Sequence, residues 1–203
     1  MKNIKLSLIA LFVLLSGITF SQKITLLEGD LSFLKGEKFL NIEYDYSKCA
    51  VGKFKTEAEY LDKKTAEYNE KEAGKGDAWR ESWVGDRQGK FEPMFEELFN
   101  KNTGKLDLYT GNEKVAKYKM IVRTTFVEPG FNVYVTKKPA SIDLIIDFVE
   151  VANPDKIICT IVSKKNPGRT MGYNDMDTGI RISESYALAG KKLGAFITKN
   201  VGK

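Results

Sequence analysis

The clearest strand pattern of the chain lies in residues 118–162, YKMIVRTTFVEPGFNVYVTKKPASIDLIIDFVEVANPDKIICTIV. In its first ten residues apolar and polar side chains alternate, which indicates a strand with one buried face. Residues 142–151 are apolar on both faces, which is typical of a strand at the centre of a sheet. Turns at 129–130 and 153–155 and a strand over 157–162 complete the pattern. Connections this short favour antiparallel hairpins over helical crossovers.

Three further segments are expected to be extended. Residues 39–46 alternate cleanly, with the tyrosines on one face and the acids on the other, so they predict a strand with one solvent face. A shorter strand is expected over 133–136, and an earlier extended piece around Leu31 to Leu34.

Helices are predicted on either side of this sheet-forming sequence. Thr56 and Glu59 form a capping box, the S/T-x-x-E pattern that opens helices. Residues 91–99 carry apolar side chains at i, i+3, i+4, i+7 and i+8, the spacing of one helical face. A last amphipathic helix follows a loop over 166–177, capped by Asp177 or Thr178. We therefore predict one α+β domain, a mainly antiparallel sheet with helices packed on one face.

Residues 1–21 predict a secretory signal peptide. Lys2 and Lys5 precede an apolar run that is too short to span a bilayer, and small residues follow it. We place cleavage after Ser21, so the mature domain is 22–203 and begins at Gln22; the alternative is a membrane anchor. No cysteine follows the apolar run, so a lipid anchor is not expected. The sequence thus predicts a soluble exported protein, periplasmic or extracellular.

Composition excludes several kinds of chemistry. The chain has no histidine, which rules out Ser-His-Asp and Cys-His catalysis and histidine-ligated metal sites. We expect no cofactor and no metal. Residues 22–203 carry a net charge of +3 without a dense basic run, so nucleic-acid binding is not expected. Cys49 and Cys159 could pair in an oxidising compartment or remain buried thiols, and the sequence leaves this open.

Trp79 and Trp83 are the first candidates for a contact surface. They lie four residues apart and hence on one helical face. Exposed aromatic faces suit recognition of sugars and of proteins, and the nearby Arg80 and Arg87 would add an anionic preference. The alternative is that both indoles pack the helix against the sheet.

The loop over 166–177 is the second candidate surface, with Arg169, Tyr173 and Asp175 as its contact residues. Its acids and amides do not have the spacing of a calcium loop. Asp143 and Asp147 would share a strand face about 13 Å apart, too far for a glycosidase pair, which spans about 5 to 9.5 Å. We expect these two acids to lie at strand ends or to pair with Arg123 or Lys119.

Four segments resemble known sequences: Gly29-Asp30-Leu31, Asn41–Tyr46, Glu128–Asn132 and Tyr186–Lys191. Together they are similar to uncharacterised exported proteins of Gram-negative bacteria, over most of the mature chain. This resemblance implies export but no activity and no site residues. The closing layout of strands and an Ala/Gly-containing helix is also loosely similar to periplasmic modules of the TolB N-terminal and CsgG-like type.

The sequence favours a non-enzymatic envelope-associated or secreted module that binds an envelope protein or a glycan. Two alternatives remain. One is a carboxylate-dependent hydrolase acting on glycans, which needs two acids from different elements in one cleft. The other is a purely structural envelope protein.

Overall fold

The computed structural model describes residues 22–133, 135–168 and 177–202; the expected signal peptide lies outside this part of the chain. The elements are, in chain order, β1 (Lys23–Gly29), η1 (Ser32–Leu34), β2 (Phe39–Asp45), β3 (Ala50–Val51), α1 (Glu57–Asn69), α2 (Lys75–Asp86), the π-helical turn η2 (Arg87–Phe91), α3 (Glu92–Thr103), η3 (Gly104–Leu106), β4 (Tyr109–Gly111), β5 (Tyr118–Glu128), β6 (Phe131–Asn132), β7 (Lys137–Lys138), β8 (Ala140–Glu150), β9 (Asn153–Gly168) and α4 (Thr178–Asn200).

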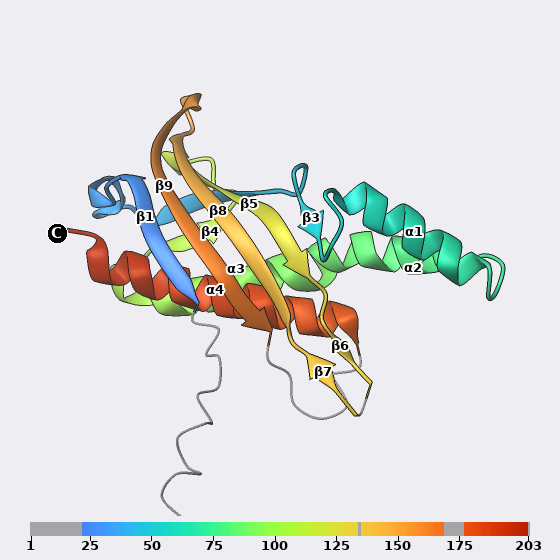
Figure 1. Ribbon diagram of the computed structural model, residues 1–203. Coiled ribbons are helices and arrows are strands. Elements are labelled where there is room, and N and C mark those ends of the chain that lie inside the picture. Colours follow the sequence, from blue (N-terminus) through green and yellow to red (C-terminus); the bar gives the residue numbers. More distant parts are fainter. Residues whose placement is uncertain (1–21, 134, 169–176, 203) are drawn as a thin grey trace, which may run out of the picture.

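One sheet organises the described residues. Strands β1, β9, β8, β5, β2 and β4 lie side by side in that order, and β3 pairs with the end of β5 (Figure 1). The first four are antiparallel neighbours. Strands β2, β3 and β4 join in parallel, because the helical segment α1–α3 carries the chain from the end of β2 back to its start. The predicted α+β architecture is confirmed, with this parallel edge as an addition.

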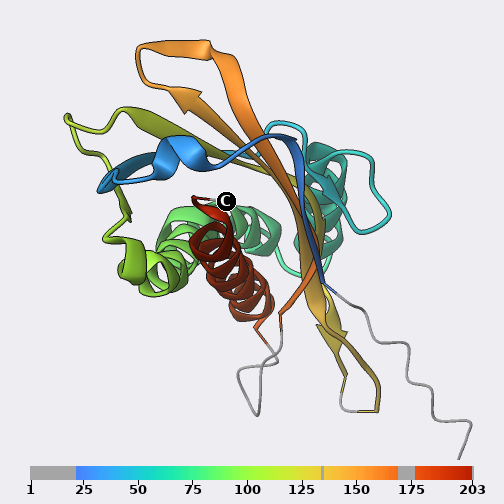
Figure 2. The same cartoon turned by 90° about the vertical axis from the view of Figure 1, so that its left-hand side faces the viewer.

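Helices α3 and α4 pack side by side on one face of the sheet (Figure 2). The core lies between them and the inward side chains of the central strands, such as Val122, Ile146 and Ile161, all of which are fully buried. Each such side chain stabilises the fold by about 1.5–3 kcal/mol through the apolar surface it removes from water.

Helices α3 and α4 are in contact where α4 carries Gly190 and Gly194. A Cβ added at Gly190 would lie 2.1 Å from the carbonyl oxygen of Phe95. A Cβ at Gly194 would lie 2.7 Å from the carbonyl oxygen of Phe99. The two glycines therefore set the distance between the helices.

Helices α1 and α2 form a hairpin that reaches beyond the sheet (Figure 1). The predicted capping box starts α1: Thr56 Oγ1 accepts a hydrogen bond from the backbone of Glu59 at 3.2 Å, and Glu59 accepts one from the backbone of Lys55 at 3.1 Å. Helix α2 continues through η2 into α3, so one helical run links the hairpin to the body.

Three local predictions were wrong or missing. The segment around Leu31–Leu34 is the 3₁₀ turn η1, started by the Asp30 side chain, which accepts a hydrogen bond from the backbone of Ser32 at 2.8 Å. Of the strand expected over 133–136, the described residues 133, 135 and 136 are not in a strand, and β6 and β7 flank them instead. Strand β1 was not predicted because Leu27, 70 % exposed, breaks the alternation of its apolar residues.

Candidate functional site

A cleft opens where the foot of the helical hairpin meets the ends of β2 and β3. Its volume is about 630 Å³, and it is lined mostly by polar side chains. The lining residues are Tyr44, Asp45, Tyr46, Ser47, Cys49, Thr56, Glu57, Ala58 and Arg87. A volume of this size is typical of a small-molecule site.

Local sequence explains how these side chains meet. Alternation in β2 turns Tyr44 and Tyr46 toward α3. The cap at Thr56 makes Glu57 the first residue of α1. On the other side, α2 ends and the π-helical turn begins at Arg87. Single π-helical turns are frequent at functional sites, because the extra residue redirects neighbouring side chains.

Arg87 is the central charged group of the cleft. Its guanidinium lies over the Tyr46 ring, 4.3 Å from the centroid, and forms an ion pair with Glu57. Glu57 also accepts a hydrogen bond from the indole N–H of Trp83 at 2.7 Å. The Tyr46 ring and the Glu57 carboxylate contact the guanidinium, and the Trp83 indole holds that carboxylate in turn, so the guanidinium is fixed in place before any ligand arrives.

A second layer of acids lies behind the two tyrosines. The Tyr46 hydroxyl donates to Glu92 Oε1 at 3.1 Å. The Tyr44 hydroxyl lies 3.2 Å from the Glu92 carbonyl oxygen and 3.4 Å from Glu96 Oε1. Burial raises the pKa of both glutamate carboxyls and of both tyrosine hydroxyls, so the tyrosines remain neutral hydrogen-bond donors.

Asp45 behaves differently from these buried acids. Hydrogen bonds from Ser47 hold the pKa of its carboxyl below the usual range, and Arg123, at 3.5 Å, adds to the effect. The cleft therefore presents the anionic Asp45, the Glu57–Arg87 ion pair and neutral hydroxyl-bearing side chains. Such a surface suits a ligand with many hydroxyl groups.

The two tryptophans lie next to the cleft but do not line it. Trp83 is buried, and Trp79 is half-buried. Both belong to an aromatic cluster on the hairpin with Phe54, Tyr60 and Tyr68. Only the indole N–H of Trp83 reaches the cleft, through Glu57. A ligand-binding role for their ring faces remains a prediction.

The two nearby arginines have different surroundings. Arg80 forms an exposed ion pair with Asp62 at 2.8 Å, away from the cleft. Arg87 is more enclosed, with a side chain 22 % exposed. The sequence drew attention to both residues but could not distinguish them, because the difference depends on the contacts of Arg87 with Glu57 and Tyr46, which lie far away in the sequence.

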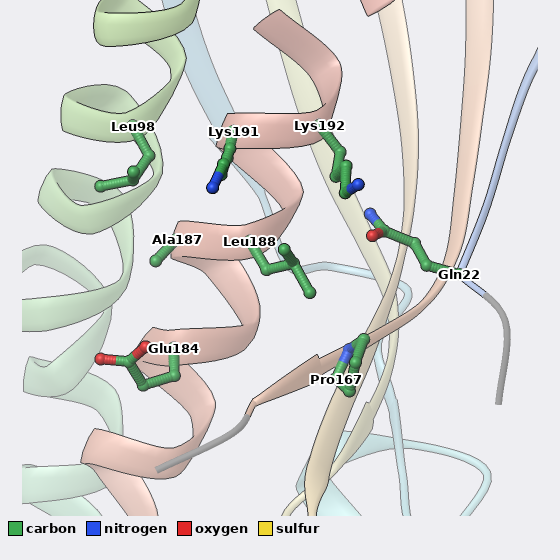
Figure 3. A pocket seen from close by; sticks show the side chains of 8 residues that line it. All are labelled: Gln22, Leu98, Pro167, Glu184, Ala187, Leu188, Lys191 and Lys192. Atoms are coloured by element: carbon green, nitrogen blue, oxygen red, sulfur yellow. The ribbon is translucent and has the colours of Figure 1, made fainter. Parts of the chain in front are cut away.

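The second candidate surface begins at a hollow beside α4. Arg169, Tyr173 and Asp175 lie outside the described residues. Residues 166–168 of the expected loop belong to strand β9 instead, and Pro167 among them lines a hollow of about 510 Å³ between α4 and the ends of β1 and β9. Figure 3 shows Lys192 pointing toward Gln22 and Lys191 on the side of α4 that faces α3. As expected, Asp177 caps α4, accepting a hydrogen bond from the backbone of Ile180 at 3.0 Å.

The other acids and thiols have structural surroundings. As expected, Asp147 pairs with Arg123, and it accepts a hydrogen bond from Thr160 at 2.6 Å. Cys49 and Cys159 are free and buried rather than joined in a disulfide.

Within residues 22–133, 135–168 and 177–202, no three acidic or cysteine side chains group as metal ligands. In the same ranges, no helix has the length and hydropathy to cross a membrane.

Comparisons with known proteins add little to this geometry. No family model matches the chain, and no curated protein matches its sequence. Two solved structures of PelC dodecamers from Paraburkholderia phytofirmans, one of them a single-residue variant, are each 10 % identical over 90 % of this chain and all of the PelC chain. Their TM-scores are 0.42 and 0.41, too low for an argument about function.

Proposed function

We propose that this chain is an exported, non-enzymatic binding module whose hairpin cleft binds a glycan. The observation that carries the proposal is the fixed Arg87 guanidinium, held by Tyr46 and Glu57 in an open polar cleft. A preorganised charged donor binds a hydroxyl-bearing ligand at little cost in side-chain entropy.

The chemistry of the lining groups favours a sugar. Sugar hydroxyls both donate and accept hydrogen bonds, so they pair with carboxylates and with guanidinium or hydroxyl groups at the same time. The cleft provides carboxylates at Asp45 and Glu57, a guanidinium at Arg87, and exposed hydroxyls at Ser47 and Thr56. A protein partner from the envelope would be a second kind of ligand for the same surface.

Export is the other half of the proposal. The signal-peptide pattern over 1–21 and the resemblance to exported proteins of Gram-negative bacteria support a periplasmic or extracellular location. Intact-mass measurement of the protein recovered from the periplasm or the medium tests it. The expected mass corresponds to residues 22–203; a full-length mass would contradict it.

A hydrolase is favoured by one observation, the raised pKa of Glu92 and Glu96. A carboxyl with a raised pKa can retain the proton that a general acid must donate. Binding is the better explanation because neither glutamate lines the cleft; both lie behind Tyr44 and Tyr46. A hydrolase would shorten bound oligosaccharides, and Glu92→Gln would stop it. A purely structural protein would bind no oligosaccharide.

A bacterial glycan microarray tests the proposal with two matched variants. Arg87→Met removes the guanidinium in the cleft, whereas Arg80→Met removes one on the same hairpin outside it. A charge-assisted hydrogen bond contributes about 1.5–3 kcal/mol, so Arg87→Met should weaken binding about tenfold or more. Arg80→Met should leave binding unchanged. Equal binding by all three proteins, or no binding by the wild type, would overturn the glycan-binding cleft.

A further inference from the structure

Strands β5 and β9, the two neighbours of β8, each contain a β-bulge opposite Asp143 of β8. On one side, Thr125 is an extra residue between the pairs Thr124–Leu144 and Phe126–Asp143. On the other side, β9 has one residue more than β8 between neighbouring pairs, with Lys165 inside the bulge. Such bulges bend a strand and redirect side chains, and they are frequent next to binding sites.

Buried polar groups hold the bulge in β9. Asn166 is fully buried, and its amide donates to the carbonyl oxygens of Ile142 at 3.0 Å and Ser163 at 3.2 Å. Its side-chain oxygen accepts from the Ser163 hydroxyl at 2.9 Å. These bonds specify one conformation, because any slip in register would leave buried polar groups without partners.

Lys165 takes an unfavourable backbone conformation within this bulge. Its φ is +55°, in the left-handed region, which costs a residue with a side chain about 1–2 kcal/mol. Its N–H donates to Asp143 Oδ1 at 2.7 Å. Asp143, one of the two acids considered in the sequence analysis, thus stabilises the bulge by accepting this hydrogen bond.

A pocket of about 320 Å³ lies beside the double bulge, on the sheet face turned away from α3 and α4. Its lining is mainly apolar, and Phe126, Pro139 and Pro167 contribute to it. Two of the four charged residues that line it pair with each other. Glu128 pairs with Lys138 at 2.6 Å.

We infer that the double bulge builds a second binding site, independent of the hairpin cleft, for a small uncharged aromatic molecule. An apolar cavity of about 150 Å³ is enough to hold benzene, so the larger volume here suits one or two rings. The mainly apolar lining provides the contact for a neutral ring.

The neutral fluorophore N-phenyl-1-naphthylamine tests this site. Wild type should bind it saturably, with enhanced fluorescence. Ser141 lines the pocket, so Ser141→Phe should fill it and weaken binding about tenfold or more. Thr25→Phe places the same side chain on the exposed edge strand, outside the pocket, and should bind the fluorophore as wild type does.

The controls separate the pocket from misfolding and from the cleft. Ser141→Leu fills the pocket less drastically and should give an intermediate loss; circular dichroism checks that each variant is folded. Arg87→Met should bind the fluorophore as tightly as wild type does, whatever happens to its glycan binding. Non-saturable binding by wild type, or wild-type affinity in both folded Ser141 variants, would overturn the inference.

Discussion

Glu57 connects the groups that shape the cleft, since it pairs with Arg87 and accepts a hydrogen bond from Trp83. Its side chain is only 16 % exposed, so the loss of its charge leaves a half-buried guanidinium without its partner. We expect Glu57→Gln to lower the free energy of unfolding by about 1–3 kcal/mol. Urea denaturation followed by tryptophan fluorescence measures this.

The matched control for that variant is Asp62→Asn. Asp62 pairs with Arg80 on the same hairpin, but these side chains are 70 % and 41 % exposed, so the loss should be below about 1 kcal/mol. Equal losses in the two variants would contradict the special role of Glu57.

Burial of Glu96 predicts a pH dependence of stability. Burial raises the pKa of its carboxyl in the folded protein above the ordinary value of 4.5. Between those two pKa values the folded state binds more protons than the unfolded state, so the contribution of Glu96 to stability falls as pH rises. Glu96→Gln removes this loss of stability with rising pH, because glutamine does not titrate.

Urea denaturation from about pH 4 to about pH 8 tests this dependence. The free energy of unfolding of Glu96→Gln, relative to that of wild type, should rise across this range. Glu97→Gln makes the same change on the exposed side of α3 and serves as the control. A relative stability that falls with rising pH would contradict the burial of this carboxyl.

The two thiols should be unreactive in the folded protein. Burial raises the pKa of Cys49 to about 12 and that of Cys159 to about 11, and only their thiolates attack a thiol reagent. Ellman's reagent should label neither in native buffer and both in denaturant. Rapid labelling of the native protein, or a mass that shows a disulfide, would contradict this.

At the scale of elements, the contact between α3 and α4 can be tested at Gly190. Alanine there would bring its Cβ against the Phe95 carbonyl oxygen, so Gly190→Ala should lower the free energy of unfolding by about 1–3 kcal/mol. Gly85 in α2 has open space around it, so Gly85→Ala should raise the free energy of unfolding by about 0.4–1 kcal/mol. Thermal unfolding of both variants should therefore show shifts of opposite sign.

Elements with a local sequence signal were predicted well. The capping box at Thr56 and the cap at Asp177 act through neighbouring residues and are present as expected. The alternation in β5 is present as far as Thr124, where the bulge at Thr125 interrupts it. The parallel edge and the π-helical turn depend on contacts between distant segments. Strand β1 is extended because it pairs with β9, whose residues lie far along the chain.

At the scale of the whole molecule, the site was harder to predict than the fold. The sequence pattern places Tyr46 in a strand and Arg87 near the predicted helices. It does not show that the Arg87 guanidinium stacks on the Tyr46 ring. That contact needs the chain to return from the hairpin through η2 onto β2. The histidine-free composition removed whole classes of catalysis but did not indicate this cleft.

Ligand binding in the hairpin cleft can be followed through the two indole N–H signals of the chain in ¹⁵N NMR. Trp83 donates its indole N–H to Glu57 beneath the cleft. Titration with size-fractionated oligosaccharides from Gram-negative cell envelopes should shift the Trp83 signal saturably, and the shift should disappear in Arg87→Met but persist in Arg80→Met. A Trp83 signal that stays in place at every concentration, or that shifts equally in both variants, would contradict binding in this cleft.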